Sequence, residues 1–196
     1  MTIWGWLLLG AGSWVLAVVL KVLADVVVQR LATVAFKDWV AALLSGVWSS
    51  VCEIGLSAFA FWYWSATFAD ALVMATGAGA AEFLILLPAA LSTKLDKKKT
   101  AKATERSNWT AFLTERTVAF ASHIAARALA WLGIGGAGGA AALASAFGLF
   151  ATTEAIQAYG QAKEWDWLNN RTLWTFLFFQ IALVLVEVAL IVIWWR

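Results

Sequence analysis

Apolar residues are concentrated in six long stretches of this chain, separated by short segments in which polar and charged residues gather. Each stretch has about the 20 residues that an α-helix needs to cross roughly 30 Å of hydrocarbon. The pattern predicts an all-α protein, a polytopic transmembrane helical bundle of about six spans. The predicted spans are residues 3–24, 40–63, 70–91, 110–133, 137–158 and 173–195.

The segments between these spans predict one domain. The segment "GIGGAGG" (133–139) is too short and too apolar for a domain linker, so it predicts a tight turn between two spans. We therefore expect residues 1–196 to form a single transmembrane helical domain. The first twenty residues carry no basic segment and no clear cleavage site, and we interpret them as a retained span rather than a signal peptide.

Composition supports the assignment to a membrane. The chain is 63% apolar and 13% charged and holds 14 tryptophans, whereas soluble proteins average about 45–50% apolar and about 25% charged residues. The net charge of +2 gives no reason to expect a nucleic-acid partner. A single cysteine, Cys52, excludes an internal disulfide. The richness in alanine and tryptophan points to a bacterial inner membrane, with the lipid bilayer as surroundings.

The basic residues predict the orientation. The loop 93–108, "TKLDKKKTAKATERSN", carries six basic residues against two acidic ones. By the positive-inside rule this loop is cytoplasmic, which places the amino terminus and "GIGGAGG" outside.

Three ionisable residues are expected near the middle of consecutive spans: Glu53, Glu82 and His123. Charged groups at this depth are costly, so they need partners or a function. Consecutive antiparallel spans usually touch, and small residues flank all three positions, so we expect one shared polar centre. Such a centre is either a set of hydrogen bonds between helices or a site of chemistry, and the residues alone leave both interpretations open.

Two further groups are candidates for this centre. Arg127 lies one helical turn beyond His123 and should face the bundle, with Glu53 or Glu187 as its counter-charge. Glu187 is also near mid-depth in the last span and is a candidate fourth member. Lys21 and Asp25, four residues apart in the first span, are expected to form an ion pair within one helix.

Four segments of the chain resemble, in order and spacing, the YhfC family of intramembrane endopeptidases, over nearly the whole length. They are "LLLGAGSWVLAVVLK", "ALLSGVWSSVCEIGLSAFAFWYW", "FADALVMATGAGAAEFLIL" and "ERTVAFASHIAARALAWLGI". The resemblance implies that Glu53 and Glu82 are the glutamates of two family motifs and that His123 is the histidine of a third. It further implies that Glu115 and Arg116 are the Glu-Arg pair that precedes this histidine.

The chain departs from the family pattern at three other positions of these motifs. Ile54 stands where the family has a second glutamate, Ser57 where it has arginine, and Ala78 where it has histidine. If the chain is an enzyme, the trio of Glu53, Glu82 and His123 can just supply the three ligands of a catalytic zinc, which leaves no general base.

We therefore predict a YhfC-like scaffold without catalytic activity, acting as a binding or assembly subunit for another membrane protein. The first alternative is a divergent intramembrane protease that uses Glu53, Glu82 and His123. The second alternative is a small transporter or channel, which is less favoured because no span is broken by proline and glycine in paired halves.

Overall fold

The computed structural model describes residues 1–35, 38–96, 102–165 and 170–195, with side chains at all of these except 25–35, 88–96, 102–112 and 170. The described chain is helical and contains no strand, so the predicted all-α class is confirmed. The helices are α1 (Ile3–Ala35), α2 (Asp38–Tyr63), α3 (Phe68–Asp96), α4 (Lys102–Gly135), α5 (Gly139–Ala162) and α6 (Asn170–Trp194).

All six helices contain a segment long and apolar enough to cross a membrane, as the hydropathy pattern predicts. The chain is therefore an integral membrane protein. These segments are Ile3–Ala24, Asp38–Tyr63, Phe68–Leu87, Leu113–Gly135, Gly139–Ala162 and Arg171–Trp194.

The connections between helices match the predicted ones at one end of the bundle and differ from them at the other. The predicted tight turn is present, because α4 ends at Gly135 and α5 begins at Gly139, whose φ is +51°. The predicted basic loop 93–108 is shorter than expected: α3 continues to Asp96 and α4 begins at Lys102. Alanine, lysine, glutamate and arginine all favour helix, so a polar stretch rich in them extends the helices that flank it.

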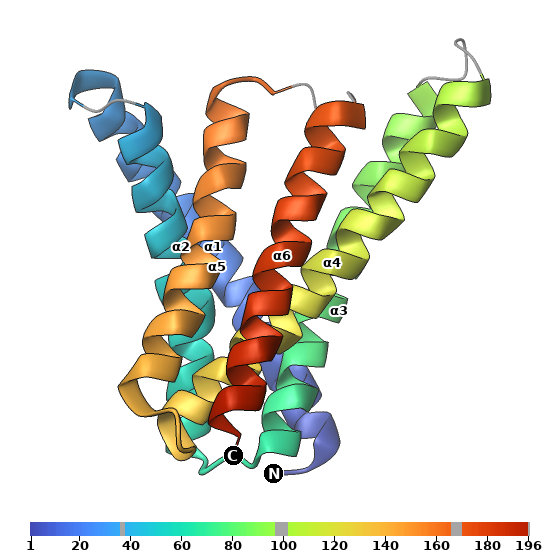
Figure 1. Ribbon diagram of the computed structural model, residues 1–196. Coiled ribbons are helices and arrows are strands. Elements are labelled where there is room, and N and C mark those ends of the chain that lie inside the picture. Colours follow the sequence, from blue (N-terminus) through green and yellow to red (C-terminus); the bar gives the residue numbers. More distant parts are fainter. Residues whose placement is uncertain (36–37, 97–101, 166–169, 196) are drawn as a thin grey trace.

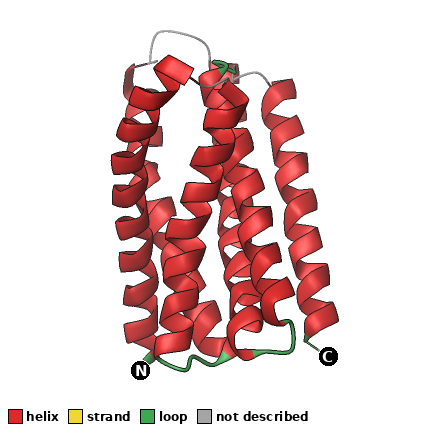
Figure 2. Cartoon of the chain, turned by 90° about the vertical axis from the view of Figure 1, so that its left-hand side faces the viewer, coloured by secondary structure: helices red, strands yellow, loops and turns green. Residues whose placement is uncertain are grey.

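The six helices run antiparallel to their neighbours in sequence (Figure 1). Both chain ends lie at the lower end of the bundle in this view, and the end of α3 and the start of α4 lie at the upper end. The pair α1 and α2 leans away from the pair α3 and α4 toward the upper end, with α5 and α6 between them. Figure 2 shows the same bundle from the side.

Glycines bring helix backbones into direct contact at two crossings. A Cβ atom on Gly10 of α1 would lie 1.9 Å from the carbonyl oxygen of Met74 in α3. A Cβ on Gly77 of α3 would lie 2.1 Å from the carbonyl oxygen of Leu7. At the crossing of α2 and α5, a Cβ on Gly46 would lie 2.4 Å from the carbonyl oxygen of Ala151. Small residues at helix interfaces permit this close approach in membrane proteins.

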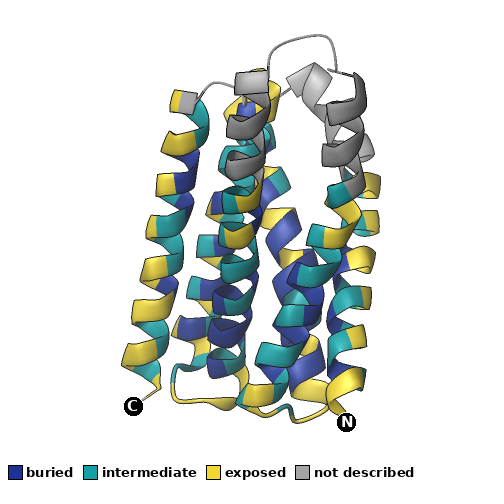
Figure 3. Ribbon diagram, turned by 90° about the vertical axis from the view of Figure 1, so that its right-hand side faces the viewer, coloured by how far each residue is buried: buried dark blue, intermediate teal, exposed yellow. Residues whose placement is uncertain are grey.

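One apolar cluster joins all six helices. Side chains that face outward are largely exposed and apolar (Figure 3), as expected of helices that face lipid. The inward side chains are buried against one another. The cluster includes Trp6 from α1, Ile54 and Phe61 from α2, Met74 from α3, Leu129 from α4 and Phe150 from α5, with Trp194 from α6 packed against it.

Candidate functional site

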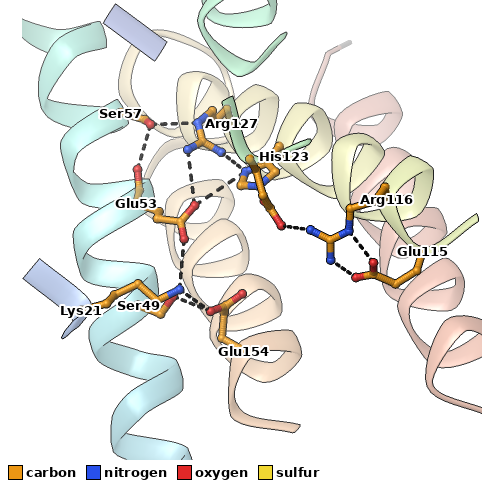
Figure 4. Close-up of polar contacts among 10 residues, drawn as sticks. Lys21, Ser49, Glu53, Ser57, Glu115, Arg116, His123, Arg127 and Glu154 are labelled. Atoms are coloured by element: carbon orange, nitrogen blue, oxygen red, sulfur yellow. Dashed lines mark hydrogen bonds and ion pairs between the residues drawn. The ribbon is translucent and has the colours of Figure 1, made fainter. Parts of the chain in front are cut away.

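Helices α2 and α4 place three polar side chains at the centre of the bundle (Figure 4). Glu53 of α2 is 3% exposed, and His123 and Arg127 of α4 are 4% and 0% exposed. The two α4 residues are four positions apart, so they project from the same face of that helix. The Oε2 atom of Glu53 lies 3.7 Å from both His123 Nδ1 and Arg127 Nη2.

Arg127 is held by its other nitrogens. Its Nε donates a hydrogen bond to Ser57 Oγ at 3.1 Å, and Ser57 Oγ donates to the backbone carbonyl of Glu53 at 2.8 Å. Its Nη1 lies 2.6 Å from His123 Nδ1. A guanidinium has no acceptor, so Nδ1 must accept this hydrogen bond. His123 is therefore the neutral tautomer that carries its proton on Nε2.

The other ring nitrogen of His123 contacts α3. His123 Nε2 donates to Glu82 Oε2, and the second oxygen of Glu82 accepts from Arg116 Nη1 at 2.6 Å. Arg116 also donates to both carboxylate oxygens of Glu115, the preceding residue of α4. Glu82 thus has a histidine on one oxygen and an arginine on the other.

A lysine extends the network on the opposite side of Glu53. Lys21 of α1 places its Nζ 2.7 Å from Glu154 Oε2 and 3.4 Å from Glu53 Oε1. Ser49, one turn before Glu53 on α2, donates to the same Glu154 oxygen at 2.7 Å. The lysine therefore links α1 to both α2 and α5 inside the apolar part of the bundle.

The result is a chain of alternating acids and bases that crosses the bundle through five helices. Four carboxyl groups face three permanent cations and one neutral histidine. The network carries one net negative charge when all four carboxyl groups are ionised and is neutral when Glu53 is protonated. In order, the groups are Glu154, Lys21, Glu53, Arg127 with His123, Glu82, Arg116 and Glu115.

The structure brings Glu53, Glu82 and His123 together, as expected for a shared polar centre. Arg127 lies beside Glu53, one of the two counter-charges considered for it. Glu187 of α6, the other one, is 1% exposed, and its Oε2 has no hydrogen-bond partner among the described residues. It forms no described ion pair with Arg127 and does not join the centre. The side chain of Asp25, the expected partner of Lys21, lies outside the described residues.

The sequence did not predict three members of this network. Lys21 and Glu154 form an ion pair with one another, and Arg116 forms an ion pair with Glu82. Helix periodicity in the sequence indicates part of this network. Ser49, Glu53 and Ser57 recur every four residues and form one polar stripe on α2. Arg116, His123 and Arg127 are separated by seven and four residues, which also places them on one face of α4.

The three expected ligands do not fit a zinc ion. Glu82 contacts Nε2 of the imidazole and Glu53 faces Nδ1, so the two carboxylates approach opposite sides of the ring. Metal coordination by all three needs them on one side. In the part of the chain that the structure describes, no group of three or more histidine, cysteine, aspartate or glutamate side chains is placed to hold a metal.

No protein-family model, no curated protein and no solved structure matches this chain.

Proposed function

We propose that this membrane protein has a YhfC-like scaffold, does not cleave peptides, and acts as a binding or assembly subunit for another membrane protein. The observation that carries the first part is the state of its single histidine. Both ring nitrogens of His123 are engaged, Nδ1 by Arg127 and Nε2 by Glu82. Hydrolysis needs a group that is free to take a proton from water, and in this arrangement the imidazole offers no free lone pair to a water molecule.

The carboxylates of Glu82 and Glu53 also have partners already. Glu82 binds Arg116 and His123, while Glu53 faces Lys21 and Arg127. Cations on a carboxylate stabilise its charged form and make it a weaker base. In this arrangement both glutamates are engaged by cations, and neither is free to accept a proton from water.

Two of the three departures from the family pattern support the same proposal. Ile54 and Ala78, which stand where the resembled family has glutamate and histidine, are both fully buried. Ile54 belongs to the apolar cluster that joins the six helices. Two positions that would hold catalytic groups in the family thus serve packing here.

The proposed binding role rests on the outward surface. Large aromatic side chains remain exposed at the lower end of the bundle, where Trp4, Trp62 and Trp64 are 71%, 65% and 45% exposed. Tryptophan and tyrosine favour the membrane interface and also provide contact area for partners. A partner helix that packs there would bury this aromatic surface.

A divergent intramembrane protease is the second candidate, because the three residues that it requires do converge. Glu82 is in direct contact with His123, which lies 3.7 Å from Glu53. Arg127 also places its guanidinium beside Ser57, the position at which the family has arginine. A cation at this place would stabilise an oxyanion.

We expect the purified protein in nanodiscs to leave a panel of transmembrane peptides uncleaved, with and without added zinc. Mass spectrometry of the peptides measures this directly. The controls are Glu53→Gln, Glu82→Gln and, as a matched buried carboxyl outside the centre, Glu187→Gln. Cleavage that is lost in the first two variants and kept in the third would establish the protease instead.

We further propose that the protein resides in a bacterial inner membrane with its amino terminus outside and its basic segment in the cytoplasm. Two exposed positions, one in the turn before α5 and one near the end of α5, test this orientation in a Cys52→Ala background. We expect Ala137→Cys to react with an impermeant thiol reagent in intact cells and Gln161→Cys to react only after the cells are opened. The reverse labelling pattern would invert the topology.

A further inference from the structure

The imidazole of His123 lies between two carboxyl groups, one on each ring nitrogen. Glu82 accepts from Nε2, and Glu53 Oε2 faces Nδ1 at 3.7 Å. Glu53 Oε2 and Arg127 Nη2 are both buried, and neither has a hydrogen-bond partner among the described residues, although they lie 3.7 Å apart. An arrangement of carboxyl, imidazole and carboxyl is suited to passing a proton, and chains of such groups mark proton pathways inside membranes.

We propose that Glu53, His123 and Glu82 form a proton relay in which the imidazole passes a proton from one carboxyl group to the other. This activity is separate from the proposed binding role and requires no peptide substrate. In the transfer, the O–H bond at Glu53 Oε2 breaks and an N–H bond forms at His123 Nδ1. The N–H bond at Nε2 breaks and an O–H bond forms at Glu82 Oε2. Glu53 begins as the acid and ends as the carboxylate, Glu82 does the reverse, and the histidine changes tautomer.

Arg127 controls this transfer. In the structure its Nη1 donates to Nδ1, which blocks the nitrogen that must receive the proton. Its Nη2 is the unpartnered atom that lies 3.7 Å from Glu53 Oε2. When Glu53 becomes ionised, the guanidinium gains a carboxylate partner by closing this gap, and charge-assisted hydrogen bonds of this kind are the stronger ones. The arginine therefore releases Nδ1 as Glu53 gives up its proton.

The charged groups around the relay stabilise both ends. On the Glu53 side are Lys21 and Glu154, from α1 and α5, and on the Glu82 side are Arg116 and Glu115, both from α4. No described ion pair connects α6 to the relay. The side chains of Lys21 and Glu154 are 25% and 22% exposed, whereas that of Glu53 is 2% exposed. On the Glu53 side, the buried relay thus meets two groups that are partly exposed.

The single histidine of the chain allows a direct test. We would label the ring nitrogens of histidine with ¹⁵N, place the protein in nanodiscs and record spectra from about pH 9 down to about pH 4, on either side of the ordinary histidine pKa of about 6.5. At high pH we expect one tautomer, with the proton on Nε2. As the relay takes up its proton, we expect a second population with the proton on Nδ1, in exchange with the first.

Variants separate the relay from a structural histidine. Glu82→Gln removes the group that accepts the proton, so the second tautomer should be lost, and Glu53→Gln should abolish it as well. Glu187→Gln, a buried carboxyl that does not contact His123, should leave it unchanged. If either relay variant fails to fold, the wild-type titration still decides. One unchanging tautomer across the whole range, or a stable imidazolium with both nitrogens protonated, would overturn the relay. Neither result measures peptide cleavage, so the relay and the proposed function are decided by separate experiments.

Discussion

Arg116→Met is expected to destabilise the folded bundle by about 3–5 kcal/mol, the usual cost of removing one partner from a buried ion pair. Arg116 donates to Glu82 and to Glu115, so its loss leaves two carboxylates without their cation. Methionine keeps most of the side-chain length, so lost packing contributes little. Thermal or denaturant unfolding in detergent measures the change.

A second variant separates charge from packing. When Glu82→Gln and Glu115→Gln are added to Arg116→Met, no uncompensated charge remains at this place, and part of the stability should return. A surface pair provides the control. Lys163 donates to Asp38 with both side chains about half exposed, and this hydrogen bond raises the pKa of the lysine. It therefore stays charged at neutral pH, yet exposed pairs contribute little, so Lys163→Met should leave the melting temperature nearly unchanged. Equal losses for the two single variants would contradict the assigned role of Arg116.

Gly10→Ala is expected to force α1 away from α3 and to destabilise the bundle by about 1–3 kcal/mol or more, as overpacking does. The new Cβ would lie 1.9 Å from the carbonyl oxygen of Met74, which belongs to the helix backbone and cannot rotate away. The melting temperature should fall sharply.

Gly12→Ala is the matched control on the same helix. A Cβ at Gly12 meets nothing within 4 Å. Alanine favours helix over glycine by roughly 1 kcal/mol, so this variant should be neutral or slightly more stable. A similar loss in both variants would show that the contact between Gly10 and Met74 does not hold the two helices together.

Hydropathy predicted the fold well because crossing a membrane is a one-dimensional requirement. Twenty apolar residues in a row define a span whatever its neighbours are. The tight turn before Gly139 was predicted for the same reason, since almost no residues separate two apolar stretches. The predicted loop at 93–108 was too long because hydropathy marks the end of the apolar region and not the end of the helix.

The polar centre was only partly predictable. Depth and helix order predicted that Glu53, Glu82 and His123 lie together, because they are at similar depth in three consecutive helices, α2, α3 and α4. The pairing of Lys21 with Glu154 joins α1 to α5, which are far apart in the chain, so no local pattern indicates it. Neither depth nor order gives the rotation of a helix about its axis. Glu53 and Ile54 are adjacent and both buried, yet one enters the ionic network and the other the apolar cluster.

The interior has an apolar part that all six helices share and a charged chain that crosses five of them. This division would let the helices tilt about the apolar part. The apolar cluster would stay fixed during such a movement, because dense packing resists deformation. The helices already diverge toward the upper end (Figure 1). A small rotation about the cluster would therefore produce a larger displacement at the upper end. The ionic chain connects α1, α2 and α5 to α3 and α4, so it limits how far these two groups of helices can move apart.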